Sequence, residues 1–208
     1  MLHVFDMDGT LLHRTTAGLE IARRLGCLQD LLDLEASFAA GTIDTRAFSA
    51  ATAALWQGIT IEVVAEVFRA SPWIGGLPEV LADVRKRGEH SLVITMSPDF
   101  FAEQLLDLGV DEVAASRFPP LPLREIPDPV GILTPADKVT IVAATLARHG
   151  LTAEQCVAYG DSGSDIPLFR WLPYTVAVNA AAELDELAAI RYQGADLREA
   201  YRLARARF

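Results

Sequence analysis

The sequence predicts an α/β fold built on a parallel sheet. Short apolar runs alternate with longer amphipathic patterns of helical spacing, and polar or turn residues follow these runs. One long stretch near the start of the chain has helical spacing throughout and interrupts the alternation. We therefore expect one sheet-based core that carries a helical insertion.

Four apolar runs are short enough to be buried strands of this sheet. They are residues 2–5, 91–94, 156–159 and 175–178. Residues 15–70, between the first two runs, are rich in Ala, Leu, Glu and Phe, with turns predicted at residues 41–44 and at Gly58. This stretch is the predicted helical insertion.

Helical patterns that end at a glycine follow the insertion and predict crossover helices. They cover residues 78–87, 101–108 and 138–149, which precede Gly88, Gly109 and Gly150. Residues 118–135 hold six of the 11 prolines, so we expect an extended loop or an irregular hairpin there. Residues 196–208 predict a final amphipathic helix that covers the core.

Composition argues against several classes of partner. The formal charge is −10, from 18 Lys+Arg and 28 Asp+Glu, and nucleic acids and anionic membranes attract basic surfaces instead. No apolar run reaches the roughly 18 residues of a membrane span, and no signal peptide is evident. We expect a cytoplasmic protein that binds neither nucleic acid nor membrane. Cys27 and Cys156 lie in no paired motif, so both are expected to be buried packing residues.

Two carboxylates follow the first predicted strand directly. Asp6 and Asp8 are two residues apart in the run Asp-Met-Asp-Gly-Thr, where Gly9 permits a sharp turn. Ligands of open α/β sheets bind at the carboxyl ends of strands. A single such Asp often only caps a turn, but burying two neighbouring acids is unfavourable unless a cation or hydrogen bonds compensate. The pair therefore indicates a divalent metal.

A second acidic cluster follows the third predicted strand. Asp161 and Asp165 lie in the glycine-bearing loop Gly-Asp-Ser-Gly-Ser-Asp. Oxygen-only ligands favour a hard cation such as Mg²⁺.

In chain order, these motifs resemble the four motifs of the haloacid dehalogenase superfamily. The matching residues are Asp6-Met7-Asp8-Gly9-Thr10, Thr95, Lys138 and Gly160-Asp161 with Asp165. The resemblance implies a Rossmann-like doubly wound parallel sheet with a small helical cap domain. The core would be residues 1–12 and 73–208, and the cap residues 13–72, closing over the site as a lid.

The resemblance also implies a mechanism. Asp6 would attack phosphorus to form an aspartyl-phosphate, while Asp8 acts as acid and base. Mg²⁺ would bind a carboxylate oxygen of Asp6, the backbone carbonyl of Asp8 and the side chain of Asp161, with Asp165 binding through water or positioning Lys138. Lys138 would neutralise the phosphoryl oxygens and the nucleophile.

The second motif allows two choices for the hydroxyl that holds phosphate, Thr95 and Ser97. We favour Thr95, because the family also binds phosphate with the next backbone N–H, which Met96 can supply and Pro98 cannot. Ser97 is then a neighbour in the substrate pocket or a turn residue.

The helical insertion resembles that of the branch containing phosphoserine phosphatases, but L-phosphoserine is a doubtful substrate. Thr15 and Ala50 occupy the positions where that branch has its ammonium-binding Glu and carboxylate-binding Arg. His13, Arg14, Arg46 and Trp56 are candidates for other substrate contacts, with Arg14 nearest the catalytic turn in sequence. We expect a small polar phosphate ester. A phosphomutase of the same fold and a non-catalytic binding or regulatory protein remain alternatives, and the oligomeric state is not indicated.

Overall fold

A six-stranded sheet forms the centre of the computed structural model, which describes residues 1–208. Every neighbouring pair of its strands is parallel, in the spatial order β5-β4-β1-β6-β7-β8. The strands are β1 (Leu2–Phe5), β4 (His90–Pro98), β5 (Glu112–Ser116), β6 (Cys156–Gly160), β7 (Thr175–Val178) and β8 (Ile190–Tyr192). This is the doubly wound order of a Rossmann-like sheet, in which the strand order reverses beside the first strand. The predicted fold class is confirmed.

Two layers of helices cover the two faces of the sheet, because side chains alternate along each strand. Phe5 belongs to the core on one face and Val4, its neighbour, to the core on the other. One layer contains α5 (Leu77–Lys86), α6 (Asp99–Ala102) and α10 (Leu197–Arg207), and the other contains α7 (Pro135–His149), α8 (Ile166–Trp171) and α9 (Ala182–Leu187). No helix combines the length and the apolar character needed to span a membrane.

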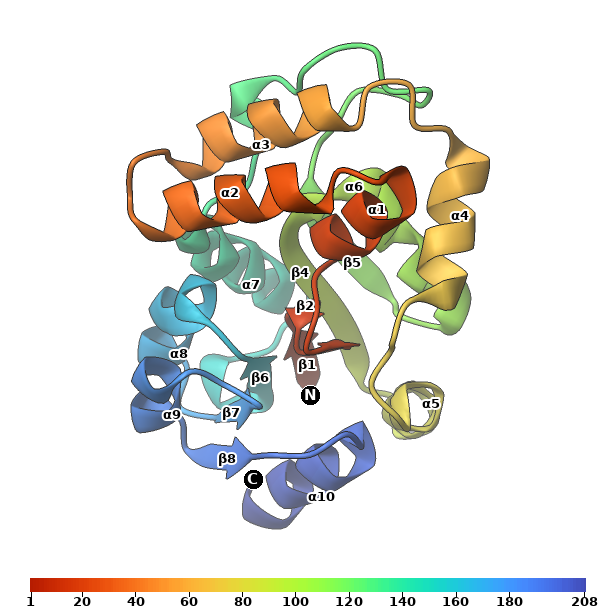
Figure 1. Ribbon diagram of the computed structural model, residues 1–208. Helices are drawn as coiled ribbons and strands as arrows, with labels where there is room; N and C mark the ends of the chain where they lie inside the picture. The colour runs from red at the N-terminus through yellow and green to blue at the C-terminus, as the bar shows by residue number, and fades with distance from the viewer.

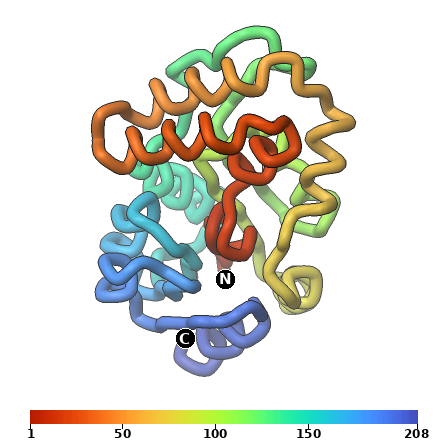
Figure 2. Tube along the Cα trace, in the orientation of Figure 1, coloured from red at the N-terminus to blue at the C-terminus, as the bar shows by residue number.

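Four helices form the predicted insertion and lie over the carboxyl ends of β1 and β4 (Figure 1). They are α1 (Ala17–Leu25), α2 (Leu28–Ala39), α3 (Thr45–Leu55) and α4 (Ile61–Ala70). Local capping sets their limits: the Thr16 side chain accepts from Leu19 N at the start of α1, and Asp44 accepts from Ala47 N at the start of α3. Figure 2 shows α2 and α3 running back along one another.

The two connections between the insertion and the sheet lie side by side. The first contains the short strands β2 (Asp8–Gly9) and β3 (Leu12–His13). His13 N donates to Pro72 O at 2.9 Å, and Ile74 N donates to Leu11 O at 2.8 Å. The chain thus leaves and re-enters the core at one place. The division into domains at residues 12–13 and 72–73 stays a prediction.

The proline-rich segment is irregular, as expected, and contacts the insertion. Gly58 N donates to Leu123 O at 2.7 Å, and Leu123 N donates to Ile59 O at 3.1 Å. Arg46 Nε donates to Pro129 O at 3.1 Å. These contacts tie α3 and the turn that follows it to a loop of the core.

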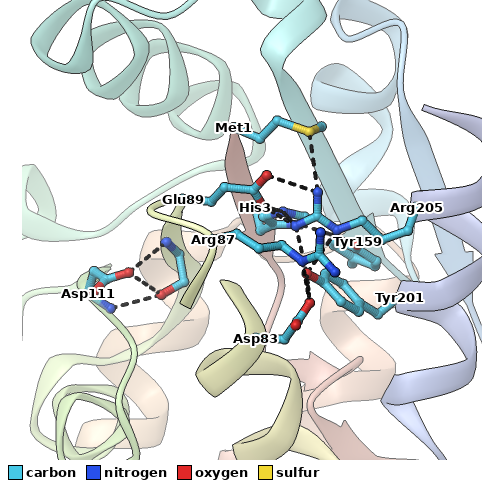
Figure 3. Close-up of polar contacts among 10 residues, drawn as sticks. Met1, His3, Asp83, Arg87, Glu89, Asp111, Tyr159, Tyr201 and Arg205 are labelled. Atoms are coloured by element: carbon cyan, nitrogen blue, oxygen red, sulfur yellow. Dashed lines mark hydrogen bonds and ion pairs between the residues drawn. The ribbon is translucent and has the colours of Figure 1, made fainter. Parts of the chain in front are cut away.

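A polar network holds α10 at the amino ends of the strands (Figure 3), at the end of the molecule opposite the insertion (Figure 1). Arg205 Nη1 donates to Glu89 Oε1 at 2.9 Å, and Arg205 Nη2 donates to Tyr201 Oη at 2.6 Å. His3 Nε2, on β1, lies 2.9 Å from Glu89 Oε2. Nearby, Ser91 Oγ donates to Asp111 Oδ2 at 2.7 Å and joins β4 to the loop before β5.

Three expectations need correction. The edge strands β5 and β8 were not predicted, because β5 is only half-buried and β8 has three residues, so neither has a long apolar run. The expected helix over residues 101–108 is α6 followed by a 3₁₀ segment, Glu103–Leu108. Cys156 is buried, but Cys27 is only half-buried because it lies in the turn before α2.

Candidate active site

The predicted site residues meet at the carboxyl edge of the sheet. Asp6 follows β1, Thr95 lies near the end of β4, and Asp161 follows β6; β4 and β6 are the two neighbours of β1. Lys138 lies in the first turn of α7, which packs beside this edge. The chain therefore brings four distant segments to the point where the strand order reverses, the usual ligand site of such sheets.

Lys138 joins two of the carboxylates. Its Nζ donates to Asp6 Oδ1 and to Asp165 Oδ1, each at 2.6 Å, and all three side chains are buried. Burial by itself would lower the pKa of Lys138, but the carboxylates of Asp165 and Asp6 raise it above its ordinary value. The ammonium is therefore held in its charged form.

Asp165 has a second role in shaping the loop after β6. Its Oδ2 accepts from Asp161 N at 3.1 Å and from Ser162 N at 3.3 Å. Gly160 leaves room for this carboxylate, since a Cβ there would lie 2.5 Å from Asp165 Cγ. Its contact with Lys138 is compatible with one of its two predicted roles, and both roles stay predictions.

Three carboxylates form a group with the geometry of a cation site. Ligand oxygens of Asp6, Asp161 and Asp165 all lie within 4.8 Å of one another. Gly9 has a φ of +81°, and a Cβ there would lie 2.1 Å from Asp161 Oδ2, so only glycine leaves room for that carboxylate. An all-oxygen group of this kind fits a hard divalent cation.

The charge balance of this group also fits a cation. Burial, with Asp165 and Asp8 nearby, raises the pKa of Asp161 to about 7. Four carboxylates, including that of Asp8, face a single ammonium here, so negative charge remains uncompensated. The site is suited to a divalent metal.

Asp8 lies beside this group but points its side chain elsewhere. Its Oδ2 accepts from Thr95 Oγ1 at 2.9 Å and from Ser97 Oγ at 2.7 Å, and its Oδ1 accepts from Ala17 N at 2.7 Å. Burial raises its pKa, although these hydrogen bonds act against the rise. The bond to Ala17, the first residue of α1, links this carboxylate directly to the helical insertion.

The two candidate hydroxyls of the second motif differ in position. Thr95 is fully buried and also accepts from Ser97 N at 3.0 Å, so it holds the irregular last part of β4. Ser97 is half-buried and lines a cavity together with Met96 and Asp8.

This cavity, about 370 Å³ in volume, lies between the carboxyl edge of the sheet and the insertion. Residues from α1, α2 and α3 close it on one side, and Asp8, the end of β4 and Phe118 on the other. Its size suits a small molecule. Asp8 is therefore at the boundary between the acidic group and an enclosed space.

The residues expected from the sequence to contact the substrate differ in their position relative to the cavity. Trp56 lines the cavity. Arg14 is exposed, has no hydrogen bond or ion pair and lies outside the cavity lining, and Arg46 instead binds Pro129 O. His13 is half-buried, with no hydrogen-bond partner for Nδ1.

Sequence reasoning missed several lining residues, chiefly Glu35, Phe38, Phe48, Thr52 and Phe118. Glu35 and Phe38 are three apart on α2, while Phe48 and Thr52 on α3 and Trp56, its C-cap, repeat every four residues. This spacing could have shown a shared helix face. It could not have shown that the face turns toward the sheet.

The fold and site together define an α/β protein with a lysine-bound acidic cluster at the switch point of a Rossmann-like sheet. The family model of haloacid dehalogenase-like hydrolases matches residues 3–170. The chain belongs to this family.

Individual relatives give a narrower resemblance. The phosphoserine phosphatase of Methanocaldococcus jannaschii is 26% identical over 200 residues, covering 95% of this chain and 94% of the relative. That of Albidiferax ferrireducens is 26% identical over 204 residues, covering 94% and 86%. A solved phospho-aspartyl intermediate analogue of phosphoserine phosphatase shares the fold, with a TM-score of 0.82, 24% identity and 97% of each chain covered. The predicted class, a hydrolase similar to phosphoserine phosphatases, is confirmed.

Proposed function

We propose that this protein is a magnesium-dependent phosphomonoesterase that transfers the phosphoryl group of a small phosphate ester to Asp6. The observation that carries the proposal is the buried ion pair between Lys138 and Asp6, which lies within a group of carboxylates that could bind a metal ion. A nucleophilic carboxylate must approach an anionic phosphate, so positive charge at this point is the first requirement.

Asp6, Asp161 and Asp165 are the side chains proposed to hold the metal, with the backbone carbonyl of Asp8. When bound, Mg²⁺ supplies positive charge that offsets repulsion between the nucleophile and the phosphate. Lys138 adds a fixed positive charge beside Asp6. Asp165 keeps that ammonium in place through its own 2.6 Å contact.

The residues of this chain carry the two chemical steps. A carboxylate oxygen of Asp6 forms a bond to phosphorus as the bond to the alcohol oxygen breaks, and protonated Asp8 gives its proton to that oxygen. Water then attacks phosphorus of the aspartyl-phosphate, Asp8 accepts the proton, and Asp6 and inorganic phosphate are released. The raised pKa of Asp8 supports its role as the acid.

Thr95, Met96 and Ser97 are proposed to hold the phosphate, through the hydroxyls and the backbone N–H of Met96. The hydroxyls of Thr95 and Ser97 already converge on Asp8. Arg14 is left out of the proposed contacts, because it is exposed and lies outside the cavity.

Phosphoserine is not the proposed substrate. Thr15 donates to Glu20 at 2.6 Å, and neither Thr15 nor Ala50 lines the cavity. These positions therefore supply no ion pair to a serine ammonium or carboxylate.

Phosphate release with Mg²⁺ tests the proposal. The panel contains phosphoserine, histidinol phosphate, sugar phosphates, phosphocholine and an aryl phosphate, with Asp6→Asn as the blank. Asp107→Asn, at an exposed aspartate outside the site, is the matched control. We expect release by the wild type and by the control but not by Asp6→Asn. No release from any ester would overturn the phosphatase proposal, and transfer between two positions of a sugar phosphate would indicate a phosphomutase instead.

A further inference from the structure

Four aromatic side chains line the cavity and form its aromatic wall. They are Phe38 from α2, Phe48 from α3, Trp56 directly after α3, and Phe118 from the loop after β5. The rings of Phe38 and Phe48 lie 5.4 Å apart between their centroids, inclined at 44°. Figure 1 shows the two helices that carry them side by side above β4. Ring faces grouped around one space can attract a cation.

All the ionisable side chains that line the cavity are acidic. Asp8 and Glu35 are its ionisable side chains, and it contains no Arg, Lys or His. A carboxylate or a second phosphate in the alcohol part of a substrate would find no basic partner here, and both acids would repel it. A positively charged group would be attracted instead.

Glu35 is placed to receive such a group. It lies one helical turn before Phe38, is half-buried, and its carboxylate takes no hydrogen bond from the protein. Burial and the nearby charge of Asp8 raise its pKa by more than the nearby charge of Arg23 lowers it, so its negative charge is only partly compensated in the free protein. A cation in the cavity would compensate it.

Two further polar atoms of the lining residues lack partners. Thr52 Oγ1 and Trp56 Nε1 are buried and form no hydrogen bond. Buried polar atoms are nearly always paired in native proteins. Thr52 Oγ1 could accept from an ammonium N–H after a side-chain shift that exposes it, whereas Trp56 Nε1 only donates and would need an acceptor oxygen of the occupant.

We propose that the cavity binds the alkylammonium group of a phosphate ester of an amino alcohol, between Glu35 and the aromatic wall, and excludes esters with a carboxylate beside that ammonium. The inference rests on the proposed phosphatase function, because the ester phosphate is assumed to lie at Asp6. It adds the chemical class of the alcohol and names Glu35, Phe38, Phe48 and Trp56 as the residues that select it.

Binding to the Asp6→Asn protein tests this inference separately from turnover. Calorimetry compares phosphocholine, phosphoethanolamine, phosphoserine and dimethylbutyl phosphate, in which carbon replaces the nitrogen of phosphocholine. We expect at least about tenfold tighter binding of the first two than of dimethylbutyl phosphate, whose alkyl group is uncharged, since ion pairing and cation–π attraction act together. Phosphoserine should bind more weakly than phosphoethanolamine.

Variants then locate the effect. Adding Glu35→Gln to the Asp6→Asn protein should reduce the preference for phosphocholine and phosphoethanolamine over dimethylbutyl phosphate to about twofold or less. Adding Asp30→Asn, at an exposed acid of α2 outside the cavity, should leave this binding preference unchanged. Phe48→Leu should weaken phosphocholine binding more than dimethylbutyl phosphate binding, because leucine keeps apolar contact but loses the ring face.

Equal binding of the ammonium esters and dimethylbutyl phosphate, or preference for phosphoserine, would overturn the inference. If the wild type nevertheless released phosphate from these esters, the phosphatase proposal would stand. An ammonium preference in binding without phosphate release from any ester would overturn the phosphatase proposal and support the ammonium site.

Discussion

The Nζ of Lys138 lies 2.6 Å from Oδ1 of Asp6, although 131 residues separate them in the chain, and both side chains are buried. The pair exists because α7 begins next to the carboxyl end of β1. Breaking a buried pair leaves an uncompensated charge, at a typical cost of about 3–5 kcal/mol.

Replacing Lys138 by methionine is therefore expected to abolish turnover and to lower the free energy of unfolding by about 3 kcal/mol. Lys86 is the only other lysine and is exposed, so Lys86→Met is the matched control and should change neither property. Urea denaturation and phosphate release measure the two effects. Undiminished turnover by Lys138→Met would show that the Lys138 ammonium is not needed for catalysis.

The proposed metal site predicts stabilisation by Mg²⁺. A ligand at one hundred times its dissociation constant adds about 2.7 kcal/mol to the free energy of unfolding. We expect Mg²⁺ to raise the melting temperature of the wild type but not that of Asp161→Ala, and chelation to stop turnover reversibly. Gly9→Ala should resemble Asp161→Ala, because its Cβ would displace the Asp161 carboxylate. Activity that is indifferent to chelator would contradict the metal assignment.

The two hydroxyls on Asp8 should differ in effect. Thr95→Val keeps the shape of the side chain but removes a donor to Asp8 and the acceptor for Ser97 N, both in a fully buried position. We expect a higher Michaelis constant, lower turnover and a loss of about 1–3 kcal/mol in stability. Ser97→Ala should have smaller effects, since water can reach that half-buried position. The opposite order in steady-state kinetics would make Ser97 the principal phosphate ligand.

The network around Glu89 predicts a pH dependence of stability. Burial by itself would raise the pKa of Glu89, but hydrogen bonds from His3 and Arg205 lower it to about 2, from 4.5. A lowered carboxyl pKa contributes stability above about pH 4.5, and this contribution is lost as the pH falls toward 2. Burial also lowers the pKa of His3 below 6.5, so its contribution declines as the pH falls through that value.

The stability difference between the wild type and Glu89→Gln should accordingly shrink as the pH falls below about 4.5. Denaturant midpoints between pH 7 and pH 3.5 would measure it, with the exposed Glu79→Gln as the control. A difference that stays constant over this range would mean that Glu89 is not ionised through the network.

The sequence was sufficient for the parts of the fold that have strong local signals. The central strands are buried on both faces, so their apolar runs are visible, and the acids that follow β1 and β6 mark the site. The edge strands β5 and β8 were missed because a half-exposed edge needs no such run.

The cavity proposed to bind the substrate was harder to predict, because it depends on how the insertion is placed. Arg14 is near Asp8 in sequence, yet its backbone turn, with φ of 57°, leaves it exposed. Glu35 is 27 residues from Asp8 in the chain, yet α2 brings it into the same cavity. Distance along the chain was therefore a poor guide to which side chains line the cavity.

The most direct test of the central claim is to identify the residue that carries the phosphoryl group. Wild-type protein is mixed with Mg²⁺ and an aryl phosphate, quenched in acid within one turnover, digested and analysed by mass spectrometry. The account predicts one added phosphoryl group on the peptide that contains Asp6, absent in Asp6→Asn. A phosphoryl group on another residue, or undiminished phosphate release by Asp6→Asn, would contradict it.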